Sequence, residues 1–289
     1  MLLLLATILL TVPAKAQNPN PGPRSATEAQ FLYDEGTRAF NAAAHDPKQY
    51  DLAQKDFERL IARYPNDSRT LKAYPKLAMI YSASRHDPEK TIQTIRKYLL
   101  LKPSAVHTKE GLELKGTLAQ AYLDAHQPTE ARITAEAILK SSVASDSAKT
   151  SALQIKTTSL IVQKKYHEAD ASLDALESRA KRKFPSIRLE LKTRECSAVP
   201  ALKKNTEDAI LDYFGKKDTC FKSALPEAVH AASEDAHAVL LLWCRAHESL
   251  IRELKAKPMD SFLKEKISKQ LSETEDFAKT INENLVHCL

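Results

Sequence analysis

The chain has 289 residues, of which 43% are hydrophobic and 28% are charged, so it carries enough apolar surface for a packed core and is not wholly disordered. Its five glycines and few β-branched runs predict an almost all-helical protein. The formal net charge of +6 favours acidic partners in general, without selecting one class.

Residues 1–16 have the pattern of a secretory leader. An apolar run extends from Leu2 to Val12, and Ala14 and Ala16 supply the Ala-x-Ala pattern of a cleavage site. The run is shorter than the roughly 20 apolar residues that span a bilayer. We therefore expect a signal peptide that is cleaved near Ala16, no integral membrane span in the mature chain, and a periplasmic or secreted location.

Residues 17–27 are predicted to link the leader to the folded body. Three prolines and one glycine within residues 17–23 disfavour a helix. Ser25, followed three residues later by Glu28, forms a capping box. A first helix is therefore predicted from this point through Phe40.

Residues 28–184 contain four copies of one helical hairpin, most clearly at residues 117–139. The second helices are predicted to begin 38, 40 and 38 residues apart, at Tyr50, Pro88, Pro128 and Tyr166. Small residues recur at one position in each first helix and one in each second helix: Gly36, Ala78, Ala119 and Thr157, then Ala53, Thr91, Ala131 and Ala169. Each hairpin has an apolar face that it cannot bury alone, which predicts stacked repeats.

The register of the third copy resembles the tetratricopeptide repeat. Ala119, Tyr122, Ala131 and Ala135 match the small and aromatic positions that let two antiparallel helices approach closely in that family. The first copy departs from the pattern by about five extra residues around Asp46, and the last two copies lack the terminal proline. The resemblance implies an all-α, right-handed superhelical solenoid of about four hairpins that serves as a binding scaffold. Together with the leader, it implies a role in cell-envelope assembly or maintenance.

In the resembling family, the first helix of each hairpin lines a binding groove. Carrying the family's positions over one at a time predicts ten groove residues here: Tyr33, Thr37, Lys72, Met79, Ser82, Lys115, Gln120, Asp124, Gln154 and Thr158. Most are polar and mid-sized, so they suit the backbone of a partner protein or peptide, and the two lysines are available to a carboxylate. The family's clamp for a C-terminal carboxylate needs more Lys, Arg and Asn than these positions supply.

Residues 185–289 lose the repeat register and are predicted to form a helical cap domain. Helices are expected over residues 186–198, 206–214 and 234–255, and from residue 260 to the end, with a break at Gly215. A cap would cover the apolar end of the last repeat.

All four cysteines, Cys196, Cys220, Cys244 and Cys288, lie in this region, and their even number agrees with export. Four buried thiols are the alternative, and four cysteines allow three pairings. A hairpin folded about Ala232 would place Cys220 opposite Cys244 and leave Cys196 for Cys288. A later turn disfavours a bridge between Cys244 and Cys288. Each bridge would stabilise the cap by ~2–4 kcal/mol.

Basic residues cluster where the repeats meet the cap, at Arg179, Lys181, Arg182, Lys183 and Arg188. No aromatic residues interleave with them, and an exported chain seldom meets nucleic acid, so we predict no nucleic-acid partner. The alternative to a protein partner is an anionic envelope polymer, bound through the basic junction around Arg179–Arg194. The simpler interpretation is a solvated helix face.

No cofactor, metal or catalytic residue is predicted. His230, His237, Cys244 and His247 recur at helical spacing, but ligands seven residues apart lie about 10 Å apart along a helix axis, too far to share one ion. No phosphate-binding loop and no nucleophile motif occurs, so no enzymatic activity is expected.

Overall fold

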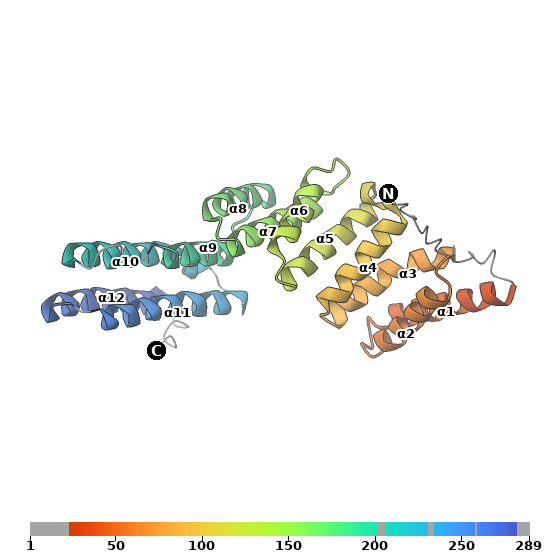
Figure 1. Ribbon diagram of the computed structural model, residues 1–289, viewed down its shortest axis with the longest axis horizontal. Coiled ribbons are helices and arrows are strands. Elements are labelled where there is room, and N and C mark those ends of the chain that lie inside the picture. The colour runs from red at the N-terminus through yellow and green to blue at the C-terminus, as the bar shows by residue number, and fades with distance from the viewer. Residues whose placement is uncertain (1–22, 201–205, 231–233, 258, 282–289) are drawn as a thin grey trace, which may run out of the picture. The chain divides into compact units, whose positions relative to one another are not determined.

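The computed structural model describes residues 23–200, 206–230, 234–257 and 259–281 (Figure 1). Every regular element within these residues is helical, which confirms the predicted all-α fold. The chain divides into two compact units, of which the first ends at Ser84 and the second begins at Arg85. The two units are described separately below.

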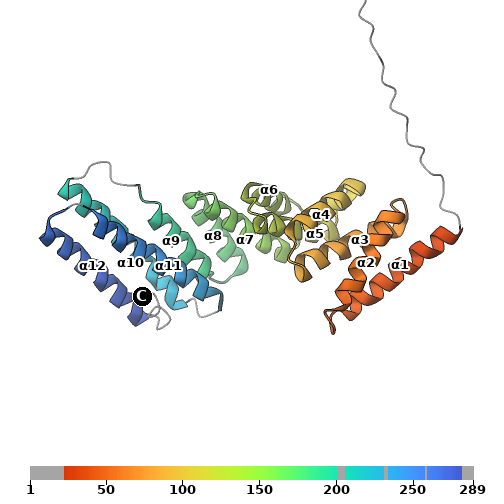
Figure 2. The same cartoon turned by 60° about the horizontal axis from the view of Figure 1, so that its bottom comes forward.

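The first unit is built on one helical hairpin and a third helix (Figure 2). Its elements are α1 (Pro23–Ala42), α2 (Gln49–Arg63), α3 (Ser68–Met79) and a π-helix (Ile80–Ser84). Helices α1 and α2 pack along each other, and α3 packs against both. The core between them includes Leu32, Phe57 and Leu60, which are 0–2% exposed. Helix α1 begins two residues before the predicted start at Ser25.

The π-helix accounts for one extra residue between the two small positions of the second copy, compared with the third. The small positions Ala78 and Thr91 are 13 residues apart, whereas Ala119 and Ala131 are 12 apart. A π-helical turn closes over one residue more than an α-helical turn, so it can absorb the extra residue. All four of these small residues are 0% exposed, so the burial pattern is preserved.

The second unit continues the hairpins. Its first elements are α4 (Pro88–Leu101), a 3₁₀-helix (Pro103–His107), α5 (Lys109–Asp124), α6 (Pro128–Leu139), α7 (Asp146–Val162) and α8 (Tyr166–Ala180). Each of these α-helices packs against the next in the chain. The predicted helix starts at Pro88, Pro128 and Tyr166 are confirmed, and the Asp87 side chain caps α4 by accepting a hydrogen bond from the Lys90 amide.

The small residues of the repeat register are all buried. Those of the first helices are Gly36, Ala78, Ala119 and Thr157, and those of the second helices are Ala53, Thr91, Ala131 and Ala169. Short side chains at these sites let neighbouring helices approach closely. Helices α1 and α2, α5 and α6, and α7 and α8 therefore pack as hairpins, as the repeat pattern predicts.

The turns before three second helices share one backbone conformation. His86, His126 and Lys164 have positive φ angles of 49°, 56° and 60°. Each lies two residues before the helix that follows it. A left-handed residue reverses the chain within few residues. The repeats thus agree in their turns as well as in their buried positions.

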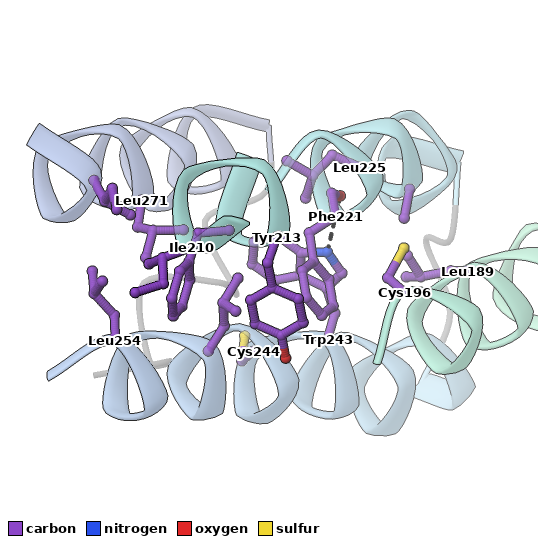
Figure 3. Packing of buried hydrophobic residues seen from close by; sticks show 14 residues of the cluster. Leu189, Cys196, Ile210, Tyr213, Phe221, Leu225, Trp243, Cys244, Leu254 and Leu271 are labelled. Atoms are coloured by element: carbon purple, nitrogen blue, oxygen red, sulfur yellow. Dashed lines mark hydrogen bonds between the residues drawn. The ribbon is translucent and has the colours of Figure 1, made fainter. Parts of the chain in front are cut away.

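The last four helices form the end of the second unit: α9 (Pro185–Ser197), α10 (Glu207–His230), α11 (Glu234–Ala256) and α12 (Ser261–Ile281). Their core contains Phe214, Phe221, Trp243 and Leu250, and Trp243 donates its indole N–H to the Phe221 carbonyl (Figure 3). None of the described helices combines the length and apolar character needed to cross a membrane.

The predicted break at Gly215 is wrong, because α10 continues through it without interruption. A glycine inside a helix costs only about 1 kcal/mol relative to alanine. Phe214 and Phe221, which are both 1% exposed, pack into the core from this helix. Burying two aromatic side chains outweighs that cost.

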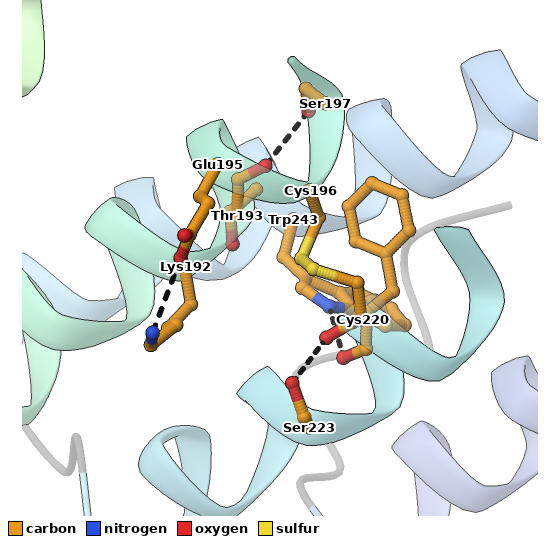
Figure 4. Close-up of a disulfide and its surroundings, with 9 residues drawn as sticks. Lys192, Thr193, Glu195, Cys196, Ser197, Cys220, Ser223 and Trp243 are labelled. Atoms are coloured by element: carbon orange, nitrogen blue, oxygen red, sulfur yellow. Dashed lines mark hydrogen bonds and ion pairs between the residues drawn. A yellow bond between two sulfur atoms is a disulfide. The ribbon is translucent and has the colours of Figure 1, made fainter. Parts of the chain in front are cut away.

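The disulfide prediction is also wrong, since Cys196 pairs with Cys220 (Figure 4). Their Cα atoms are 5.5 Å apart. The continuous α10 lies along α9, which brings Cys220 to the end of α9 where Cys196 lies. This pairing excludes both predicted bridges, Cys220 with Cys244 and Cys196 with Cys288. Cys244 is 4% exposed in the core, and Cys288 lies outside the described residues.

Candidate functional site: the accessible faces of the first helices

The first helices of successive hairpins are neighbours in the second unit. Helix α5 packs against α7, and α7 packs against α9. In α5 and α7, the buried small residues Ala119 and Thr157 occupy equivalent positions. Equivalent positions of stacked repeats point to the same side. The accessible residues of α5 and α7 can therefore be compared pair by pair.

Four pairs of equivalent positions form the accessible stripes of these two helices. They are Glu113 with Ser151, Gly116 with Gln154, Gln120 with Thr158, and Asp124 with Val162. Each residue is either exposed or half-buried. Four of the five groove residues predicted in this unit fall on these stripes: Gln120, Asp124, Gln154 and Thr158.

The accessible face of α5 carries a hydrogen-bonded pair of polar side chains and, next to Gly116, an open space. Gln120 Nε2 donates to Asp124 Oδ1 at 2.9 Å. A Cβ added to Gly116 would have no heavy atom of the described chain within 4 Å. Lys115 is half-buried and lies one residue outside the stripe. The surface next to Gly116 can thus receive a group from another molecule.

The accessible stripe of α7 is uncharged, and the buried side of this helix is held against α8 by hydrogen bonding. The Thr157 hydroxyl donates to the Leu153 carbonyl at 2.9 Å and lies 2.9 Å from Ser172 Oγ of α8. This buried bond holds α7 against α8. Gln154 and Thr158, on either side of Thr157, are accessible. Their amide and hydroxyl groups can both donate and accept hydrogen bonds.

The other five predicted groove residues lie in the first unit: Tyr33, Thr37, Lys72, Met79 and Ser82. Lys72 is exposed, and Met79 is 52% exposed. Tyr33 is half-buried, with its ring centroid 6.4 Å from that of Phe57, so part of this side chain packs in the core. Thr37 and Ser82 are half-buried, and Ser82 lies in the π-helix.

The predicted basic cluster is largely paired with carboxylates. Arg188, whose side chain is 16% exposed, bonds to Asp170 at 3.3 Å and to both Asp174 and Glu177 at 2.9 Å. These carboxylates come from one face of α8, where they are spaced four and three residues apart. That spacing is the signal in the sequence that indicates this network.

The remaining cations of the cluster are placed as follows. Arg179 pairs with Asp146 at 2.7 Å, and Lys183 pairs with Glu177 at 2.8 Å. The Arg182 guanidinium lies 4.5 Å from the Phe184 ring centroid. Exposed Lys181 ends α8 in a left-handed conformation. Five cations thus share this surface with four carboxylates, so little net positive charge remains.

Glu177 is the centre of this charge network. Burial alone would raise the pKa of its carboxyl group, but hydrogen bonds from Lys183, Arg188 and the Phe184 amide outweigh burial and lower the pKa below its ordinary value. A hollow of ≈ 410 Å³ adjoins the network, and its lining includes Asp174, Glu177, Lys181 and Arg182. Its walls carry both signs of charge, which does not favour an anionic ligand.

Two of the four His and Cys residues that recur at helical spacing have side chains that the structure describes. The backbone of His230 and His237 lies in helices, but their side chains are not among the described ones. Cys244 and His247 are 4% and 1% exposed, within the core of the last helices. Among the described residues, no group of three or more His, Cys, Asp or Glu side chains has the geometry of a metal site.

No protein-family profile matches the chain, and no curated protein is similar to it in sequence. Among solved structures, the fold is similar to a tetratricopeptide repeat protein from Parabacteroides merdae ATCC 43184, with a TM-score of 0.49 and 10% sequence identity. The similarity covers 91% of this chain and 98% of that one.

Proposed function

We propose that the chain is an exported scaffold that binds an extended segment of a partner protein along α5 and α7, in the assembly or maintenance of the cell envelope. The observation that carries the proposal is the pairing of equivalent positions on these adjacent helices. Small residues such as Ala119 and Thr157 are buried, while Gln120, Gln154 and Thr158 beside them remain accessible.

The chemistry of the stripes favours a peptide backbone. Ser151, Gln154, Thr158 and Val162 carry no charge, so the α7 stripe offers hydrogen bonds and a small apolar contact. An extended peptide presents alternating amide donors and carbonyl acceptors, which glutamine and hydroxyl side chains can satisfy. The open space at Gly116 accommodates one side chain or a bend of that segment.

Export is supported by two independent features. The first is the leader pattern of residues 1–16. The second is the disulfide between Cys196 and Cys220, because such bonds persist in oxidising compartments such as the periplasm or the extracellular space. This location supports a partner in the cell envelope.

Binding of an anionic envelope polymer is less well supported. Arg188, Arg179 and Lys183 each pair with a carboxylate of the same chain, so these cations are already partly neutralised. Polymer binding through exposed charges weakens steeply between low and physiological salt, whereas binding along the uncharged α7 stripe responds less. Salt dependence therefore distinguishes the two functions.

Site-specific crosslinking tests where the partner binds. A photo-reactive residue is placed at Gln154, and a matched one at Gln93, an exposed glutamine on the second helix α4. In intact cells of the source organism, we expect a crosslinked protein from position 154 and none from position 93. Equal crosslinking from both positions, or none from position 154, would contradict binding along α7.

Substitution of a glycine on the α5 stripe then tests partner binding without destabilising the fold. Gly116 and Gly215 both lie inside helices, and a Cβ at either would meet no heavy atom of the described chain within 4 Å. Replacing either by arginine should not reduce stability, because glycine is the poorer helix former. Gly116→Arg should weaken binding of the identified partner at least tenfold, whereas Gly215→Arg should leave it unchanged. If Gly116→Arg bound as tightly as the wild type, the site would lie elsewhere.

A further inference from the structure

A polar cluster lies among the last three helices. Its buried members are Asp218 on α10, His247 on α11 and Thr274 on α12, and half-buried Glu275 and exposed Gln270 of α12 adjoin them. The side chains of Asp218 and His247 are each 1% exposed, and that of Glu275 is 17% exposed. Burying ionisable groups is costly unless they are bonded. The cluster therefore depends on its internal contacts.

Asp218 of α10 links this helix to α12 through hydrogen bonds. Its carboxylate accepts a hydrogen bond from Thr274 Oγ1 at 2.5 Å and one from Gln270 Nε2 at 2.8 Å. On its own helix, Lys222 Nζ lies 3.5 Å away. Hydrogen bonds to a charged acceptor are stronger than those between neutral groups.

His247 lies between two carboxylates at the centre of the cluster. Its Nε2 is 3.9 Å from Asp218 Oδ1, and its Nδ1 is 3.5 Å from Glu275 Oε1. Neither nitrogen has a hydrogen-bond partner among the described residues. The ring stacks on Trp243, with centroids 5.1 Å apart and planes inclined by 3°. The environment of Trp243 thus reports directly on this cluster.

Of the side chains of α12 that the structure describes, which end at Asp276, few contribute apolar surface to the core. Its described buried apolar side chains are Ile267 and Leu271, with Leu263 partly buried against them. Most other described residues of α12 are exposed. Along this described part of α12, the hydrogen bonds from Gln270 and Thr274 to Asp218 add to the packing of these few apolar side chains.

We propose that the buried cluster of Asp218, His247 and Glu275 is an acid-sensitive latch that releases α12 from α10 and α11 when Asp218 takes up a proton. The ionised Asp218 carboxylate can accept hydrogen bonds from Thr274 and Gln270 at the same time. The protonated group has a donor of its own that must be satisfied, and it no longer offsets the charge of Lys222. Release uncovers the apolar faces of Ile267 and Leu271 and the core residues beneath them.

The direction of the pH dependence follows from Asp218. Burial would raise the pKa of its carboxyl group, but the neighbouring His247 and the hydrogen bonds from Thr274 and Gln270 lower it below its ordinary value. A group with a lowered folded pKa stabilises the structure above its unfolded pKa, about 3.9 for aspartate. The latch is closed at neutral pH and opens as pH falls below about 4 through that lowered pKa.

Hydrogen exchange read by mass spectrometry tests the latch in the intact chain. After correction for the intrinsic pH dependence of exchange, peptides from α12 should lose protection at a higher pH than peptides from α5 and α7. Trp243 is the only tryptophan in the sequence, and its emission should shift with the α12 transition. Loss of protection in α12 together with α5 and α7, or after them, would overturn the proposal.

A second test removes the Asp218 carboxylate at constant pH and compares the result with a matched control variant. At neutral pH, Asp218→Asn should speed exchange in α12 at least tenfold, with α5 and α7 protected as before. Asp212→Asn, on the same helix, removes a carboxylate that is 61% exposed and should leave α12 unchanged. Normal protection of α12 in Asp218→Asn would overturn the latch. Should this variant fail to fold, the pH series on the wild-type chain decides.

Discussion

Gly36 lies directly against the ring of Phe57, across the interface of α1 and α2. A Cβ added to Gly36 would be 2.8 Å from Phe57 Cε1 and 3.0 Å from Cδ1. Phe57 is 0% exposed, so its ring is enclosed by the core and a shift of the ring would disturb other buried side chains. The absence of a side chain at Gly36 sets the separation of the two helices.

We predict that Gly36→Ala lowers stability. Overpacking of a core costs about 1–3 kcal/mol, and the gain in helix propensity returns at most about 1 kcal/mol. Urea unfolding of the wild type and the variant measures the net loss. Adding Phe57→Leu in the Gly36→Ala background should recover part of it. A stability gain from Gly36→Ala alone would mean that the helices can separate freely.

Gly111 should tolerate a side chain even less. A Cβ at this position would lie 1.8 Å from the Ala105 carbonyl oxygen, which belongs to the backbone of the 3₁₀-helix. A backbone segment moves less easily than a side chain, so we expect Gly111→Ala to cost about 3 kcal/mol or more. Gly116→Ala, in the same helix, has open space and should gain up to about 1 kcal/mol. Thermal unfolding of the two variants should shift in opposite directions.

The disulfide between Cys196 and Cys220 should stabilise the junction of α9 and α10. It closes a loop of 24 residues, for which chain entropy predicts about 3 kcal/mol. We expect Cys196→Ser with Cys220→Ser to lose stability of this size in chemical denaturation. A loss below about 1 kcal/mol would show that helix packing alone holds the junction.

Peptide mapping without reduction should recover the bridge between Cys196 and Cys220. Because the sequence has four cysteines, the same map should join Cys244 to Cys288. Reduction before digestion, as the control, should separate both pairs of peptides. A peptide that joins Cys220 to Cys244 would contradict the fold of these helices.

Glu177 should contribute stability that depends on pH. Its lowered pKa means that its contribution is present above the ordinary glutamate pKa, about 4.3, and is lost as pH falls through the lowered value. We expect Glu177→Gln to lose on the order of 1–2 kcal/mol at neutral pH and to approach the wild type in acid. Asp174→Asn removes a carboxylate that is 67% exposed and should change stability by less than about 1 kcal/mol. A constant difference between Glu177→Gln and the wild type at every pH would contradict the charge network.

The hairpins could be predicted because their signals are local. A proline at the first helical position marks the starts at Pro88 and Pro128, and both starts are confirmed. The period of small residues identified positions such as Ala119 and Ala131, which are buried. Whether the groove residues bind a partner stays a prediction.

The last helices could not be predicted in the same way, because their determinants are tertiary. Gly215 indicates a helix end locally, but the burial of Phe214 and Phe221 overrides it. The pairing of Cys196 depends on which helices lie side by side. Arg188 contacts carboxylates up to 18 residues earlier in the chain, and its basic neighbours in the sequence obscured that network.

The π-helix after α3 shows how this architecture tolerates insertions. One additional residue enters the second copy at the end of a helix, and the buried registers before and after it are unaffected. The first copy accommodates its extra residues in the turn around Asp46 instead. Repeat length can therefore change by single-residue insertions at helix ends, and each insertion leaves the core intact. Hairpins of this kind can diverge in length while every intermediate sequence still folds.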